Sequence, residues 1–307
     1  MKLKNLKREI KKELLLIINY LLNYPLIFKL IGIINKKFKI IENIFIAYPA
    51  NRAYAEAYAY KRFYPQMKWT PWIAALLKHK KSFGIMMVVS ATEEDFLDSA
   101  NLKNLQLMVK RTEIIGNLLG VSQITYSGVL PGILHKHCIR QSYIEADITI
   151  NVILASEKLI LSQLGFPSDL PLIILGNKGF IGTRLTSRLN NREYYSIDFQ
   201  SPNAANVKDW PFHLKNKPAV LINVSRKFVM TNYIHLFWPE LIIINDVYPE
   251  SSREEIQKIS EIGCSFYHVS GVKGRSWPRF PKVYKEGLPC CGTIYSKDPF
   301  VIVHKYC

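Results

Sequence analysis

Three glycines at three-residue spacing, Gly176, Gly179 and Gly182, follow directly on a short apolar run, Leu172–Leu175. The run is typical of a buried parallel strand, and residues 183–189 have a helical pattern. In this order, the glycines allow a tight turn, close approach of a pyrophosphate to backbone N–H groups, and close packing of helix on strand. The pattern therefore predicts a dinucleotide-binding loop, whose other members are Asn177, Lys178, Phe180 and Ile181.

Polar side chains follow at positions where such a domain contacts its cofactor. Asp198 lies in a second expected strand, 194–199, about 20 residues after the glycines, where a carboxylate hydrogen-bonds the ribose hydroxyls of NAD. Asn223 and Ser225 come at the end of a third expected strand, 219–224, and ligands lie at the carboxyl ends of parallel strands. Asp198 disfavours the 2′-phosphate of NADP, whereas Lys178 could reach it, so the expected cofactor is NAD(P)H, with a preference for NAD(H).

The elements around this loop predict an α/β protein in three parts. Residues 1–42 are a basic and apolar N-terminal segment, residues 43–165 an α/β substrate domain, and residues 166–307 a Rossmann-type parallel-sheet domain with a C-terminal tail. The expected elements of the substrate domain are a strand at 83–90, helices after Thr92 and at 102–119, a strand at 123–127, a loop at 127–132 and a long helix at 149–164. Further strands of the last domain are expected at 241–245 and 264–269, with crossovers between them.

Several of these segments resemble the long-chain acyl-ACP reductases, which form fatty aldehydes. They are the helix leading into the strand and GNKGFIG, the segments VLINVS and IINDVYPE, and the closing GLPCCG. The resemblance implies a reductase that uses NADPH and a cysteine near the end of the chain, which would be Cys290 or Cys291. The chain departs from the family in the residues flanking these cysteines and in having Asp198 where the family has a basic residue.

The resemblance implies that an acyl group moves from acyl-ACP or acyl-CoA to the cysteine and leaves as an aldehyde after hydride transfer. A thiol suits this step because exchange with a thioester is nearly balanced in energy. Lys282, Lys285 and His268 are candidates for lowering the pKa of that thiol, and Cys138 is the rival nucleophile. Two alternatives remain open: another two-domain dehydrogenase that acts on a small substrate, and a membrane-associated binding or scaffold protein without turnover.

The chain carries 41 basic and 24 acidic residues, a net charge of +17, which favours an acidic partner such as an acyl carrier, CoA or an anionic membrane. Lysines gather in residues 1–13, where Leu3, Leu6 and Ile10 have helical spacing, and the uncharged stretch 14–28 follows. This predicts an amphipathic helix in the membrane interface; a buried helical hairpin and a signal peptide are the alternatives. A stretch of about 15 residues broken by Pro25 is too short to span a bilayer.

Other classes of function have weaker signals. Aromatic and basic residues alternate in residues 44–77, but no helix-turn-helix, RRM or zinc-finger pattern accompanies them, so no nucleic-acid partner is expected. Five cysteines without paired spacing argue against a disulfide framework and a metal site. Cysteines without a disulfide framework indicate a reducing compartment, so a cytoplasmic protein is expected; an interfacial N-terminal helix would make it peripheral on the inner face of the membrane.

Overall fold

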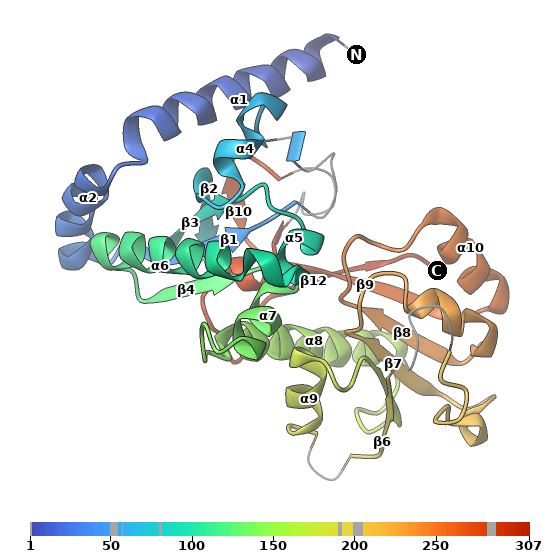
Figure 1. Cartoon of the computed structure of the whole chain (residues 1–307). Helices are drawn as coiled ribbons and strands as arrows, with labels where there is room; N and C mark the ends of the chain where they lie inside the picture. Colours follow the sequence, from blue (N-terminus) through green and yellow to red (C-terminus); the bar gives the residue numbers. More distant parts are fainter. Residues whose placement is uncertain are drawn as a thin grey trace. The chain divides into compact units, whose positions relative to one another are not determined.

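The chain forms two compact units (Figure 1). The computed structural model describes residues 2–49, 55–56, 58–79, 82–189, 192–198, 205–280 and 287–307, with side chains from Leu6 onward. Unit 1 comprises Met1–Glu145 and Lys273–Tyr295, and unit 2 comprises Ala146–Val272 and Ser296–Cys307. Each unit has a sheet with parallel strand pairs and helices, so the expected α/β class is confirmed.

The sheet of unit 1 has mixed strand directions and the order β10-β2-β3-β1-β4. Its strands are β1 (Ile41–Ala47), β2 (Trp72–His79), β3 (Ser82–Val88), β4 (Gln123–Tyr126) and β10 (Arg275–Trp277). β1 runs parallel to β3 and β4, whereas β2 runs antiparallel to β3 and β10. The two strands expected in this half of the chain are present as β3 and β4.

Helices surround this sheet. They are α1 (Lys2–Leu22), α2 (Pro25–Phe38), α4 (Tyr64–Met67), α5 (Glu93–Leu97), α6 (Leu102–Leu119) and α7 (Leu130–Lys136). A capping box between Thr92 and Asp95 starts α5, and Gly120, with a φ of +66°, ends α6. The prediction of a loop at 127–132 was wrong for its second half, because α7 begins at Leu130. The helix tolerates Pro131 in its first turn, where a missing N–H costs no helical hydrogen bond.

The unit boundaries differ from the expected domains at the N-terminal segment and at the long helix. Residues 1–42 belong to unit 1, because Leu15 and Phe28 pack into its core. The long helix α8 (Ile144–Leu164) belongs to unit 2 from Ala146 onward. Its Asp147 pairs with two arginines of that unit, and its Glu157 pairs with Arg192 at 2.7 Å.

The sheet of unit 2 has five parallel strands in the order β6-β5-β7-β8-β9. They are β5 (Leu172–Leu175), β6 (Tyr194–Ile197), β7 (Ala219–Asn223), β8 (Leu241–Asn245) and β9 (Ser265–Lys273). A further strand, β12 (Val301–Lys305), pairs antiparallel with β9. Numbered along the chain, the parallel order is 2-1-3-4-5, so the order reverses between β5 and β7.

The connections in unit 2 are partly unlike those expected. α9 (Phe180–Thr186) follows β5 and α10 (Arg253–Ile262) precedes β9. Within the described residues, the links before and after β7 contain only the 3₁₀ segments η3 (Phe212–Leu214) and η4 (Met230–Leu236). α9 also begins three residues earlier than the helix expected at 183–189.

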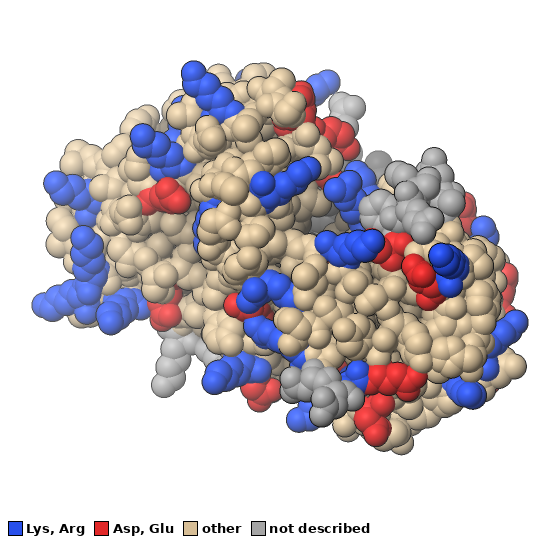
Figure 2. Space-filling view, turned by 60° about the horizontal axis from the view of Figure 1, so that its bottom comes forward, with Lys and Arg blue, Asp and Glu red and all other residues tan. Residues whose placement is uncertain are grey.

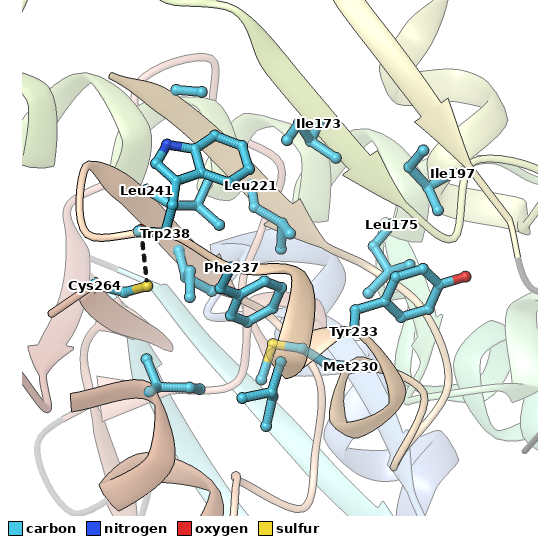
Figure 3. Packing of buried hydrophobic residues seen from close by; sticks show 14 of the residues in the cluster. Ile173, Leu175, Ile197, Leu221, Met230, Tyr233, Phe237, Trp238, Leu241 and Cys264 are labelled. Carbon is cyan, nitrogen blue, oxygen red and sulfur yellow. Dashed lines mark hydrogen bonds between the residues drawn. The ribbon is translucent and has the colours of Figure 1, made fainter. Parts of the chain in front are cut away.

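The apolar core of unit 2 explains why η4 can replace a crossover helix. Tyr233 from η4 and the neighbouring Trp238 pack with Leu175 and Leu221 from the sheet (Figure 3). The Trp238 indole N–H donates to the Lys217 carbonyl at 2.8 Å, which satisfies its one polar atom. Large aromatic side chains thus cover this face of the sheet without a full helix. Cys264 is buried beside them, and burial raises the pKa of its thiol to about 12.

Candidate functional site

The glycine loop joins β5 to α9 at the place where the strand order reverses. Gly176 has a φ of +98°, and a Cβ on it would lie 2.7 Å from the backbone of Ser225. A Cβ on Gly182 would lie 2.2 Å from the Gly176 carbonyl oxygen. Both glycines are therefore required by the fold itself.

The structural demand for glycine is much weaker at Gly179. Its φ is −72°, which any residue adopts, and a Cβ would meet only the Gly176 carbonyl oxygen, at 3.1 Å. Gly179 is also exposed, as is Lys178 beside it. The Thr183 hydroxyl donates to the carbonyls of Asn177 and Gly179, at 3.2 and 3.0 Å, and so fixes the loop. A bare backbone at Gly179 thus leaves the outer surface of a rigid loop open.

Asp198 and Ser225 follow the two strands that flank β5: Asp198 comes directly after β6, and Ser225 comes two residues after the end of β7. The Gly176 N–H donates to the Ile197 carbonyl at 2.9 Å, which places Asp198 next to the start of the loop. The Asp198 carbonyl accepts from the Asn206 side chain at 3.1 Å. The structure therefore brings the glycine loop, Asp198 and Ser225 together, as the sequence predicted. They lie at the edge of the sheet that the carboxyl ends of its parallel strands form.

A buried polar network crosses the same edge. Asn223, Asn245 and His268 lie in register on β7, β8 and β9 and are 2%, 1% and 0% exposed. The Asn223 amide donates to Asn245 at 2.7 Å, and Asn245 Nδ2 lies 3.1 Å from His268 Nδ1. At the other end, the Ser225 hydroxyl donates to Asn223 at 2.6 Å. The network therefore connects the residue beside the glycine loop to the far strand.

His268 ends this network as a neutral histidine. Burial, and to a smaller extent the nearby His304, lowers its pKa to about 4. Because Asn245 donates to Nδ1, the ring proton belongs on Nε2, which is buried and has no hydrogen-bond partner in the described part of the chain. Ser270, two residues further along the same strand, also has a buried hydroxyl without such a partner. Two buried polar groups at this edge, His268 Nε2 and the Ser270 hydroxyl, thus have no hydrogen-bond partner among the described residues.

Sequence reasoning missed Asn245 as part of a site and gave His268 another role. A signal was present, because two strands, VLIN and LIIIN, are apolar except for a closing asparagine. Asparagine is depleted in strands, so its repetition at two strand ends indicates a polar edge. The partnership with His268 depends on strand register, which the sequence does not specify.

The cysteine pair lies in unit 1, not in the domain expected for it. Cys290 is half-buried and Cys291 is buried, and their sulfur atoms are 3.7 Å apart. They belong to a 3₁₀ turn, η6 (Cys290–Gly292), which agrees with the proline- and glycine-defined turn in the sequence. Asn43 and Gln123 donate to the carbonyls of Gly292 and Thr293, at 3.3 and 2.9 Å. These bonds attach the segment to β1 and β4 and explain why residues 273–295 return to unit 1.

None of the three residues expected to lower the pKa of the thiol is placed by the described structure in a position to do so. Lys282 and Lys285 lie outside the described residues. His268 belongs to unit 2 and is neutral near pH 7, so it cannot supply the positive charge that lowers a thiol pKa. Cys138, the rival nucleophile, is exposed just after α7, with a φ of +53°.

Comparison with protein families and with curated proteins finds no match. No protein-family model matches this chain, and no curated protein matches it either. The resemblance to the acyl-ACP reductases therefore rests on the quoted motifs alone.

An apolar cavity in unit 1 bears on the size of the substrate. It has a volume of about 10 Å³ and lies between α1 and β2. Leu15, Phe63 and Trp72 are among its lining residues. A space of this size holds about one water molecule, so an acyl chain would enter only if these side chains moved.

Proposed function

We propose that the carboxyl edge of the sheet in unit 2 binds a nicotinamide dinucleotide and that the protein is an NAD(P)H-dependent oxidoreductase. The observation that carries this proposal is Gly179, a glycine that the fold demands far less than Gly176 and Gly182, exposed in a loop at the reversal of strand order. In doubly wound sheets of the Rossmann type, ligands bind outside the carboxyl ends of the strands at such a reversal. The order 2-1-3-4-5 is one of the two common orders of this class.

The residues of this edge have separable roles in the proposal. Backbone N–H groups of the loop would hold the pyrophosphate, and Asp198 would accept hydrogen bonds from the ribose hydroxyls. The Asn223 amide already bonds Ser225 and Asn245, at 2.6 and 2.7 Å, so we assign it the role of positioning Ser225 rather than of contacting the cofactor. When bound, the dinucleotide supplies a hydride.

Binding of the dinucleotide is tested by titrating the full chain with NADH and following nicotinamide fluorescence. Gly179→Ala adds a methyl group on the open surface of the loop, and we expect it to weaken binding about tenfold or more. Ser162→Ala is the control, because Ser162 is exposed on α8 of the same unit and alanine suits a helix. Equal affinities for the two variants would contradict the site.

We further propose a long-chain acyl thioester, as acyl-CoA or acyl-ACP, as the substrate. The thiolate of one cysteine attacks the thioester carbonyl, and the carrier thiol leaves with a proton. Hydride transfer to the enzyme thioester then releases an aldehyde and restores the thiolate, while NAD(P)H becomes NAD(P)⁺. Cys290 is the better candidate for the nucleophile because it is more exposed than Cys291. The net charge of +17 suits the phosphates of CoA or an acidic carrier.

Mass spectrometry tests the acyl step without the reduction. After incubation with a long-chain acyl-CoA in the absence of nicotinamide, the adduct should lie on the peptide with Cys290, and Cys290→Ser should remove it. Cys138→Ser is the control, since that thiol is exposed but distant in sequence. An adduct on Cys138 would transfer the role to that residue. NADH binding without any aldehyde from acyl-CoA would favour a binding protein without turnover or a different dehydrogenase.

A further inference from the structure

Helix α1 has two faces that both carry apolar residues. Its inner face packs on unit 1 through Leu15 and Asn19, which are 4% and 7% exposed. The opposite face carries large apolar side chains that are all more than half exposed: Leu6, Ile10, Ile17 and Leu21. Their spacing of four, seven and four residues follows one side of a helix. This outer stripe contributes nothing to the core.

Helix α2 repeats this arrangement. Phe28 and Gly32 form its inner face, and Gly32 lies so close to α6 that a Cβ would be 1.8 Å from the Leu118 carbonyl oxygen. Leu26, Leu30 and Ile33 lie on the opposite side and are 67%, 51% and 62% exposed. Two successive helices thus present apolar faces away from unit 1. Scattered exposed apolar residues need no explanation, but a continuous set on two helices does.

Asparagines fix the inner faces firmly. The Asn19 side chain donates to the Ile73 carbonyl at 2.8 Å and accepts from its N–H at 2.7 Å. Asn35 forms the same pair of bonds with Ile41, both at 2.7 Å. The helices are therefore integral to the fold, and only their outer faces are available to a partner.

The charge around these faces is almost entirely basic. Residues 14–41 contain no acidic residue, and Lys29, Lys36 and Lys37 are exposed on α2. On α1, by contrast, Lys12 pairs with Glu9 at 3.1 Å and Lys11 lies over the Tyr58 ring, so these two cations serve the fold. Figure 2 shows basic groups along its left-hand edge, the side on which Figure 1 shows α2.

We propose that the outer faces of α1 and α2 bind the surface of an anionic lipid bilayer and lie in the plane of its headgroups. Apolar side chains flanked by lysines fit the acyl boundary and the anionic headgroups of such a surface. Tyr20 and Tyr24, both exposed near the bend between the helices, belong to a residue type that favours this depth. A second copy of the chain fits less well, because the lysines of two copies would face one another.

The helices bind in the plane rather than across the bilayer. In the described part of the chain, no single helix has the length and apolarity of a membrane span; α1 and α2 meet that criterion only as a pair bent by 87°. Insertion of this pair would break the bonds of Asn19 and Asn35 and expose the inner faces. Binding in the plane keeps both.

Vesicle flotation of the full chain tests the proposal. We expect the protein to float with vesicles of phosphatidylcholine containing roughly a third phosphatidylserine, and to bind pure phosphatidylcholine or high-salt samples several-fold less. The combined variant Ile17→Ser, Leu21→Ser, Leu30→Ser and Ile33→Ser should bind about tenfold less or worse. Lys29→Gln with Lys37→Gln should reduce binding several-fold and remove most of its salt dependence.

The control variant changes apolar residues that are equally exposed in unit 2, Phe228→Ser with Phe300→Ser, and should bind as the wild type does. Unchanged melting temperatures and circular dichroism would show that the variants fold. The proposal is overturned if the wild type does not float, if the four-residue variant floats equally well, or if light scattering shows a dimer that this variant dissociates while vesicles do not bind.

Discussion

The two sheets of this protein both place buried polar side chains among apolar strand residues, but these side chains have different partners. In unit 1, Asn43 and Thr125 donate to the backbone carbonyls of Gly292 and Cys291. In unit 2, Asn223 and Asn245 bond one another, and the network ends at a buried His268 nitrogen without a partner among the described residues. Polar residues that bind the chain's own backbone are explained by the fold, whereas those left with spare capacity beside an open loop indicate a ligand site.

The largest effect is expected at the glycine loop. Gly182→Val would drive a side chain into the Gly176 carbonyl and the Asn177 backbone, which cannot move cheaply. We expect the free energy of unfolding to fall by about 3–5 kcal/mol, whereas Gly179→Ala should cost less than about 1 kcal/mol. Urea unfolding followed by circular dichroism measures both. Similar costs at the two positions would contradict the distinction between a glycine needed by the fold and one left open.

The pH dependence of stability tests whether His268, at the end of the network in unit 2, is neutral in the folded protein. Between pH 6.5 and 4 the unfolded chain binds a proton at His268 that the folded chain does not bind, so stability should fall as the pH falls through this window. The loss amounts to roughly 3 kcal/mol at the acid end. His268→Gln should lack this loss of stability. The buried carboxyls, whose pKa is raised, stabilise the folded protein as the pH falls. Because both proteins contain these carboxyls, the difference between the two pH profiles gives the contribution of His268 alone. Parallel pH profiles would show that folding does not lower the pKa of His268.

Removing one asparagine from each sheet compares the networks directly. Asn245→Ala leaves the Asn223 amide and His268 Nδ1 buried without their partner and should cost about 2–3 kcal/mol of unfolding free energy. Asn43→Ala removes one long bond, 3.3 Å, to the Gly292 carbonyl and should cost about 1 kcal/mol. Urea unfolding gives both values. A larger cost for Asn43→Ala would reverse the comparison.

The smallest effect concerns the choice of cofactor. We expect tighter binding of NADH than of NADPH, because the carboxylate of Asp198 repels a 2′-phosphate, and Asp198→Ala should narrow the ratio of dissociation constants about tenfold, or about 1.4 kcal/mol. Asp169→Ala, an exposed acid before β5, is the matched control. Isothermal titration of both cofactors measures the ratio; tighter NADPH binding by the wild type would exclude this role for Asp198.

The strands of unit 2 could be predicted because buried parallel strands are continuous apolar runs. β5 and β8 have the expected bounds, Leu172–Leu175 and Leu241–Asn245, and the loop after β5 was recognisable from its glycines. The domain boundary could not be predicted, because α8 joins unit 2 through ion pairs with residues about 35 positions further on, such as Glu157 with Arg192.

The prediction that the cysteines belong to the same domain as the glycine loop was wrong for a related reason. Cys290 and Cys291 belong to unit 1 because Asn43 and Gln123 bind the segment that carries or follows them, at sequence separations of 249 and 170 residues. The residues that neighbour the cysteines in the sequence do not indicate such contacts. The amphipathic character of residues 1–22 was recognisable, but the side that packs on the sheet was not, since both faces of α1 contain apolar residues.

Hydrogen exchange of the full chain with and without NADH tests most directly whether the edge of unit 2 is the ligand site. We predict that NADH slows exchange in peptides covering residues 175–184 and 245–248, and leaves the peptide covering α6 of unit 1, Leu102–Leu119, unchanged. Gly179→Ala should abolish this protection at the same NADH concentration. Protection confined to residues 290–295, or none in residues 175–184 at saturating NADH, would contradict the account.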